Sequence, residues 1–119
     1  MARNKPHKKL DLWGKSIEFV VLIYRITRDF PKEEEFGLKS QMRRAAVSVP
    51  SNISEGLTRR SRKERLHFLY IAQASLSEID AQLEISEKLD YLSNTAVLET
   101  DNLQTDVERL LSGLIRSFG

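Results

Sequence analysis

The chain has 119 residues, of which 40% are hydrophobic and 30% are charged, and its formal net charge at pH 7 is +2. This length supports one domain with a single hydrophobic core. Cysteine is absent, which excludes disulfide bonds and thiolate metal sites. Residues 1–9 are basic and lack the apolar core of a signal peptide, and no apolar run approaches the roughly 20 residues that span a bilayer. We therefore expect a soluble cytoplasmic protein, with a flexible basic tail over residues 1–9 and one domain over residues 10–118.

The first predicted helix covers residues 10–30 and carries two apolar rows. The row predicted to face the core consists of Trp13, Ile17, Val20, Val21 and Tyr24. The second row consists of Leu12, Phe19, Ile23, Ile26 and Phe30. Only one face of a helix meets the core of a four-helix bundle, and large apolar patches are seldom left in water. The second row is therefore predicted to be an oligomer interface.

The second predicted helix runs from an acidic start at residues 33–35, which suits a helix N-terminus, to near Gly56. Its apolar side chains, spaced three and four residues apart, are Leu38, Met42, Ala45, Val49, Ile53 and Leu57. Small residues are interspersed among them: Ala45, Ala46, Ser48, Ser51 and Ser54. These small side chains would allow a neighbouring helix to approach closely, and Pro50 removes one hydrogen bond of the helix.

The third predicted helix begins at Ser61, which forms a capping box with Glu64, and runs to about Leu89. Its core positions are Leu69, Ala72, Leu76, Ile79, Leu83 and Ser86. A polar break over residues 90–94 precedes the last helix, whose apolar positions are Leu103, Val107, Leu110, Leu114 and Phe118. Four helices with short connections predict an all-α, antiparallel, up-down-up-down four-helix bundle.

Charge is distributed unevenly along the chain. Residues 1–65 carry 16 basic and 8 acidic residues, whereas residues 66–119 carry 3 basic and 9 acidic residues. This pattern has two interpretations. Either the two halves pair with each other in the fold, or a basic surface is kept for a polyanion.

Residue patterns for catalysis or metal binding are absent from the sequence. The histidines are His7 and His67, so no nucleophile–histidine–carboxylate arrangement and no Glu-x-x-His metal motif can be assembled. The glycines stand singly and form no phosphate-binding loop. We therefore expect no enzymatic activity, no cofactor, no metal and no small-molecule substrate.

The positive signal for function is a set of basic residues. The candidate nucleic-acid contacts are Lys8, Lys9, Arg43, Arg44, Arg59, Arg60, Arg62, Lys63 and Arg65. Clustered cations bind phosphates without a required spacing, so the pattern fits nucleic acid, protein carboxylates or solvent. Arg43 and Arg44 are consecutive and point in different directions, which would allow one of them to serve a structural contact.

The sequence over about residues 10–92 resembles a known family. The most specific segment is Gln-x-Arg-Arg-Ala-Ala-x-Ser-x-Pro-x-Asn-Ile-x-Glu-Gly over residues 41–56. It is accompanied by Leu12-Trp13, by the segment from Phe30 to Glu34, and by residues 68–72. Together these residues resemble the four-helix-bundle proteins encoded in 23S rRNA intervening sequences.

The resemblance implies a ring-like homopentamer around a central channel. It also implies similarity to the accessory proteins of diversity-generating retroelements, which bind a reverse transcriptase and nucleic acid through a basic surface. Two hypotheses follow. The first is a non-enzymatic oligomer that binds structured RNA, DNA or a nucleoprotein. The second is a protein-interaction scaffold, such as an accessory subunit of a reverse transcriptase.

Overall fold

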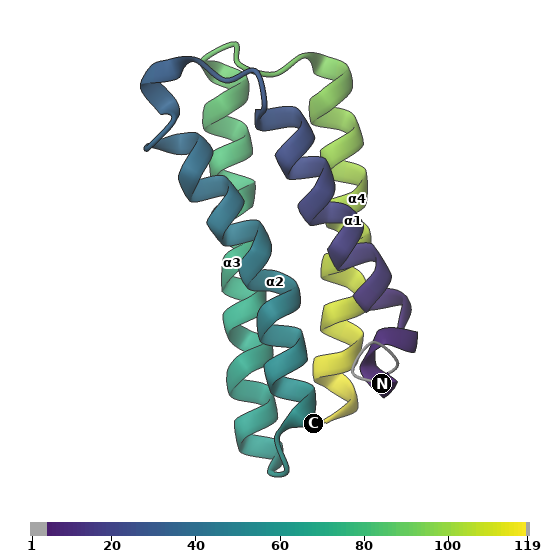
Figure 1. Cartoon of the computed structure of the whole chain (residues 1–119). Coiled ribbons are helices and arrows are strands. Elements are labelled where there is room, and N and C mark those ends of the chain that lie inside the picture. The colour runs from purple at the N-terminus through teal and green to yellow at the C-terminus, as the bar shows by residue number, and fades with distance from the viewer. Residues whose placement is uncertain (1–4, 119) are drawn as a thin grey trace.

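The chain folds into an antiparallel bundle of α-helices. The computed structural model describes residues 5–118. The helices are α1 (Asp11–Thr27), α2 (Leu38–Thr58), α3 (Arg62–Lys88) and α4 (Asn94–Ser117). Short 3-10 helices, η2 (Pro6–Lys9) and η3 (Lys32–Glu34), precede α1 and α2 respectively. Figure 1 shows successive helices running in opposite directions, and the part of the chain shown in colour contains no strand. The all-α four-helix prediction is confirmed.

The boundaries of α3 follow from local backbone chemistry. Ser61 is the N-cap of α3, and its hydroxyl accepts a hydrogen bond from the Glu64 amide at 3.1 Å. At the other end Asp90 adopts a positive φ of 61°, and the Tyr91 amide donates to the Ser86 carbonyl at 2.9 Å. This is the left-handed C-terminal turn that glycine usually supplies and that aspartate tolerates. The predicted start and end of this helix are thus confirmed within one residue.

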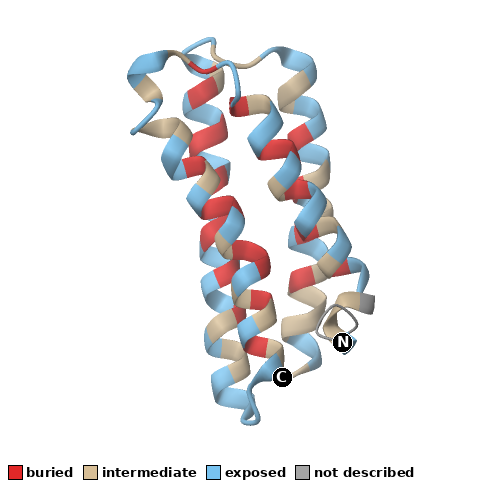
Figure 2. Ribbon diagram, viewed as in Figure 1, coloured by how far each residue is buried: buried red, intermediate tan, exposed pale blue. Residues whose placement is uncertain are grey.

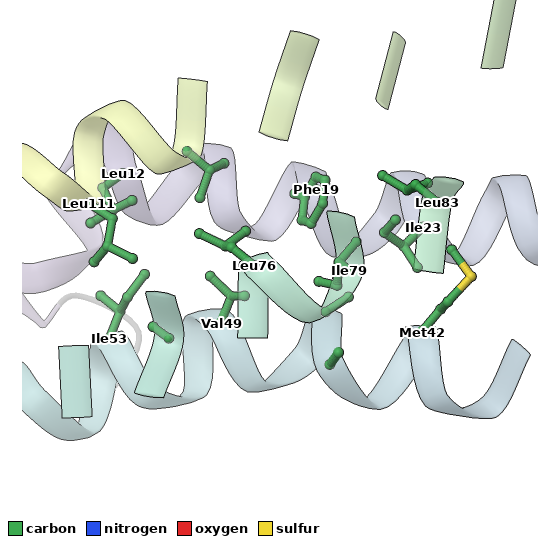
Figure 3. Packing of buried hydrophobic residues seen from close by; sticks show 14 of the residues in the cluster. Leu12, Phe19, Ile23, Met42, Val49, Ile53, Leu76, Ile79, Leu83 and Leu111 are labelled. Atoms are coloured by element: carbon green, nitrogen blue, oxygen red, sulfur yellow. The ribbon is translucent and has the colours of Figure 1, made fainter. Parts of the chain in front are cut away.

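The core lies along the bundle axis and receives side chains from all four helices (Figure 3). Every position predicted to face the core from the third helix is buried. In α2 the central predicted positions are buried, while Leu38 and Leu57 at the two ends are half-buried. α4 contributes Val107 and Leu111 to the core. Helical periodicity therefore predicted the buried faces of α2 and α3 correctly.

The two apolar rows of α1 have the reverse of their predicted roles. Phe19 and Ile23 are 0% exposed within the subunit, whereas Val21 is 61% exposed and Ile17 and Tyr24 are also exposed. Figure 2 shows the buried side of α1 turned toward the other helices. The predicted core row is therefore largely a surface row, with Trp13 and Val20 half-buried at its edges.

The predicted oligomer interface is wrong, because its residues fill the core of the subunit. Four of them are buried, and Ile26 is half-buried against the core. The four buried residues are Leu12, Phe19, Ile23 and Phe30. The Phe30 ring also packs against Tyr91, with ring centroids 5.2 Å apart. Both rows of α1 have helical spacing, so periodicity could not rank them. The contacts that α1 makes with the other helices decide which row is buried.

Helices α2 and α3 approach each other closely at small residues. Gly56 is buried, and a Cβ atom placed on it would lie 3.1 Å from the Arg65 carbonyl oxygen and 3.2 Å from the Phe68 Cβ. Nearer the middle of α2, the Ser48 and Ser75 hydroxyl oxygens lie 2.9 Å apart. α2 continues through the buried Pro50. The small residues of α2 therefore allow the close helix contact that the sequence predicted.

Two ion pairs join the basic first half of the chain to its acidic second half. Lys15 on α1 lies 3.6 Å from Asp106 on α4, and Arg25 pairs with Glu99 on the same two helices. These side chains are solvent-exposed by a third or more, so each pair contributes about 1 kcal/mol or less. The paired-halves interpretation thus holds for α1 and α4.

Within residues 5–118, none of the helices combines the length and the apolar character that spanning a bilayer requires.

Candidate nucleic-acid interface

The predicted basic residues fall into two groups at opposite ends of α2. Arg43 and Arg44 lie in its first turns, whereas Arg59 and Arg60 follow its last residue. At 1.5 Å of rise per residue, Arg44 and Arg59 are separated by about 22 Å along the helix axis. The structure therefore does not bring all the candidate residues into one surface.

Arg43 is a structural residue. Its Nε donates to the Thr27 hydroxyl at 3.0 Å, and its Nη2 donates to the Tyr24 carbonyl at 3.1 Å. The guanidinium also lies 4.4 Å from the centroid of the Tyr24 ring. Tyr24 and Thr27 are in the last turn of α1, where backbone carbonyls lack partners within the helix. Arg43 thus ties the end of α1 to α2, which leaves the exposed Arg44 for other contacts.

Arg59 is also committed to contacts within the subunit. Its Nη2 donates to the Glu55 carboxylate at 2.8 Å, and its guanidinium lies 4.9 Å from the Phe68 ring centroid. Its backbone carbonyl accepts a hydrogen bond from the Arg65 Nε at 2.7 Å. These contacts shape the short connection between α2 and α3.

Arg62 and Arg65 hold the end of α4 against the start of α3. Arg62 Nε donates to the Phe118 carbonyl, and the Arg65 guanidinium lies 5.5 Å from the Phe118 ring centroid. Cations near the C-terminal end of a helix also interact favourably with its dipole. These two arginines therefore contribute to the fold as well as to the local positive charge.

Arg60 and Lys63 are the outward members of this connection. Both side chains are exposed, and the hydrogen bonds and ion pairs that the arginines make here, over residues 5–118, involve Arg59, Arg62 and Arg65. Arg60 and Lys63 can therefore contact a ligand without losing a contact in the fold.

The N-terminal helix η2 adds cations to the same end of the bundle. Lys5, Pro6, His7 and Leu10 line a shallow cavity of about 360 Å³ together with Leu57 and Thr58, at the end of α2. Figure 1 shows the N-terminal segment and the α2–α3 connection at the same end of the molecule. We define the basic corner as Lys5, Lys8, Arg60 and Lys63.

Part of the predicted tail forms a short helix. Residues 6–9 form η2, and the His7 ring packs edge-on against Trp13 with centroids 4.8 Å apart. Residues 1–4 of the predicted tail lie outside the described residues, as does the side chain of Lys9. Burial, followed by the positive charges of Lys8 and Lys5, lowers the pKa of His7 below its ordinary value. A local positive potential therefore surrounds this histidine.

Acidic side chains gather at the other end of the bundle. Asp80, Glu84 and Glu87 of α3 and Asp101 of α4 line a groove between these two helices. Nearby, burial and then the negative charge of Asp80 raise the pKa of Glu108, and Asp101 adds to this effect. The acidic groove between α3 and α4 and the basic corner thus lie toward opposite ends of the molecule. The uneven charge distribution along the sequence therefore corresponds to an uneven charge distribution in the structure.

A bound metal ion requires several ligating side chains in a suitable geometry. Among residues 5–118, no group of three or more His, Asp or Glu residues is arranged to hold a metal ion. The arrangement instead offers exposed cations on a rigid helical framework, which is suited to binding a polyanion.

Residues 8–113 match the family model of the 23S rRNA-intervening sequence protein. The chain belongs to this family. The chain is also similar to a solved structure from Bacteroides thetaiotaomicron, a protein of unknown function from the S23 ribosomal protein family. The TM-score is 0.80 and the sequence identity is 25%, covering 88% of this chain and 95% of that chain. A comparison of this chain with curated proteins found no match. The sequence resemblance to this family is thus confirmed.

Sequence reasoning missed the aromatic and carbonyl partners of the arginines. Phe118 is separated from Arg62 by 56 positions, and Tyr24 from Arg43 by 19 positions, so no local pattern reveals these contacts. One signal was present, because two consecutive helical arginines cannot point in the same direction. It indicated that Arg43 and Arg44 have different roles without indicating which one is structural.

Proposed function

We propose that this 23S rRNA-intervening sequence protein is a non-enzymatic, oligomeric protein that binds structured RNA or a nucleoprotein. The observation that carries the proposal is the convergence of cations from η2, the end of α2 and the start of α3 at one end of the bundle. Residues 55–65 contain five basic residues and the carboxylates Glu55 and Glu64, and Glu55 already pairs with Arg59. The corner is therefore positively charged.

The four residues of the basic corner are proposed as the phosphate contacts. Each cation that neutralises a phosphate releases condensed counterions, which favours binding and makes it salt-dependent. Arg59, Arg62 and Arg65 are not proposed as phosphate contacts, because their guanidinium groups are already hydrogen-bonded within the subunit. The nucleic-acid backbone, and not its base sequence, would be recognised here.

The test is a salt titration of a double variant, Arg60→Gln with Lys63→Gln. Anisotropy of a labelled structured RNA and a labelled duplex DNA would be followed at several salt concentrations. We expect the wild-type protein to show a linear dependence of log affinity on log salt, and the variant to lose about 2 from the size of that slope. Affinity should fall for both probes.

The matched control removes two cations on α3 and α4 that lie outside the basic corner, Lys88→Gln with Arg109→Gln. Both of these residues are exposed. Because each variant loses two cations, the control and the test variant have the same net charge. Equal losses in the two variants would mean that only net charge matters, and an unchanged affinity in the corner variant would refute the proposed contacts.

A protein-interaction scaffold is the alternative, and the exposed row of α1 favours it. Ile17, Val21 and Tyr24 form an apolar stripe on the surface of the subunit. Such a stripe is suited to a second copy of the chain or to another protein, for example a reverse transcriptase. Capture of one partner protein that survives nuclease treatment, by a protein that fails to bind RNA, would support the alternative.

A further inference from the structure

Phe36 is a large apolar side chain on the surface of the molecule. Its side chain is 95% exposed, and it lies in the connection between η3 and α2. The Glu34 carboxylate fastens this connection, because one oxygen accepts from the Leu38 amide at 3.1 Å and the other accepts from the Tyr91 hydroxyl at 3.0 Å. A single exposed apolar residue is common on protein surfaces, so the surroundings of Phe36 decide what it can bind.

A shallow groove of about 460 Å³ lies beside Phe36. The side chains that line it include Tyr24, Glu35, Phe36, Lys39, Arg43 and Arg44. Three of these residues are cations and one is a carboxylate, and Glu35 pairs with Lys39 at 3.2 Å. The groove therefore combines aromatic surface with net positive charge.

The two arginines of the groove have different roles: Arg43 is held by contacts within the subunit, and Arg44 is available to a ligand. Arg43 is held against the Tyr24 ring and the end of α1, so it gives the groove a rigid, positively charged wall. Arg44 is exposed next to it and can reach an anion. An aromatic ring open to solvent beside such cations is the arrangement that binds unpaired bases together with their phosphates.

We propose that this groove binds a single-stranded segment of nucleic acid, with a base stacked on Phe36 and its phosphate beside Arg44. This inference rests on the proposed function and adds a second site, at the other end of α2 from the basic corner. Bases within a duplex are already stacked on each other, so a duplex would contact the corner and leave Phe36 unused. The positive charge of the groove favours a polyanion over an apolar peptide.

The test compares Phe36→Ala with the wild-type protein on two labelled strands, an oligoadenylate about 12 nucleotides long and an abasic strand of equal length. Stacking of one base predicts that Phe36→Ala weakens binding of the oligoadenylate by at least about fivefold. Binding of the abasic strand, and the salt dependence for both strands, should not change, because Phe36 contacts no phosphate. Phe36→Trp should restore the affinity.

Leu98→Ala is the matched control, since Leu98 is another exposed apolar side chain, on α4 and outside both the groove and the exposed row of α1. It should leave the affinity for both strands unchanged. Equal weakening of the two strands by Phe36→Ala, or a change in subunit number, would overturn the stacking site and assign Phe36 to a protein contact. No effect of Phe36→Ala, combined with duplex binding that depends on Arg60 and Lys63, would refute this site and leave the proposed function standing. Absence of binding to any nucleic acid would refute both.

Discussion

Arg43 and Arg44 are neighbours with different physical roles. Arg43 satisfies carbonyl and hydroxyl oxygens at the end of α1 and stacks on Tyr24, whereas Arg44 is exposed. The planar guanidinium suits Arg43 to this task, because it donates in two directions and lies flat on an aromatic ring. The chemistry of a basic residue in this protein therefore depends on the helix face that carries it.

Replacing Arg43 with lysine should destabilise the fold although the charge is kept. A lysine ammonium cannot reproduce both hydrogen bonds and the stacked contact, so we expect a loss of about 1–3 kcal/mol in the free energy of unfolding. Urea denaturation would measure it. Arg44→Gln is the control and should change the free energy of unfolding by less than about 0.5 kcal/mol. Equal stability of Arg43→Lys and wild type would contradict the structural role of Arg43.

His7 should report on the basic corner. Because burial and the charges of Lys8 and Lys5 lower its pKa below 6.5, we expect its NMR titration midpoint to lie below that value. The neutral form is favoured in the folded state, so the small stabilisation that this shift provides is lost as the pH falls below 6.5. Phosphates bound beside Lys5 and Lys8 would offset their charge. The midpoint should therefore rise on addition of RNA, and a midpoint that does not move at saturating RNA would place the bound RNA elsewhere.

At the scale of the elements, the contact between α2 and α3 depends on Gly56. Substituting Gly56 with alanine would place a methyl group against the Arg65 carbonyl and the Phe68 Cβ, both of which are fixed to the α3 backbone. We expect a loss of about 1–3 kcal/mol in the free energy of unfolding. Gly14→Ala is the opposite case, because nothing lies within 4 Å of the added atom. It should stabilise α1 by about 0.5–1 kcal/mol. Thermal and denaturant unfolding of both variants would test this, and a stabilising Gly56→Ala would contradict the close approach.

The buried faces of the helices were predictable to different extents. In α3 the apolar residues at successive spacings of three and four form the buried row, so spacing identified the buried face, although the opposite side also carries the exposed Tyr70 and Ile85. In α4 the stripe containing Val107 was found, but the buried Thr100 and Gln104 were missed, because these polar residues bury through hydrogen bonds to the Ala96 and Leu76 carbonyls. Polar residues of this kind carry no hydrophobic signal.

At the scale of the whole molecule, the exposed row of α1 bears on assembly. We expect self-association through Ile17, Val21 and Tyr24, in place of the buried row that periodicity suggested. Val21→Glu should lower the subunit number measured by sedimentation, because a carboxylate would have to be desolvated at the interface. Leu98→Glu is the control, since Leu98 is 63% exposed on α4. If Leu98→Glu dissociates the assembly and Val21→Glu does not, the interface involves α4 at Leu98 and not the exposed row of α1.

The basic corner was partly predictable. Arg60 and Lys63 were identified from charge alone, and their exposure is as expected for the turn between two helices. That Lys5 lies beside Thr58 could not be predicted, because η2 is brought there by its packing and by no pattern in the intervening residues. Nor could the arginines that hold the fold be separated from those that face solvent.

The sequence by itself determined the class of this protein, the positions of its helices, the buried faces of α2 and α3, and its family. These properties depend on residues a few positions apart, through the helical periodicity of apolar side chains and the capping of helix ends, so a short stretch of sequence is enough to predict them. The tertiary structure alone decided which row of α1 is buried, which arginines are structural, and that Phe36 and Arg44 border one groove. Each of these depends on contacts between residues far apart in the chain, where the space left by other side chains selects among local alternatives that are equally helical.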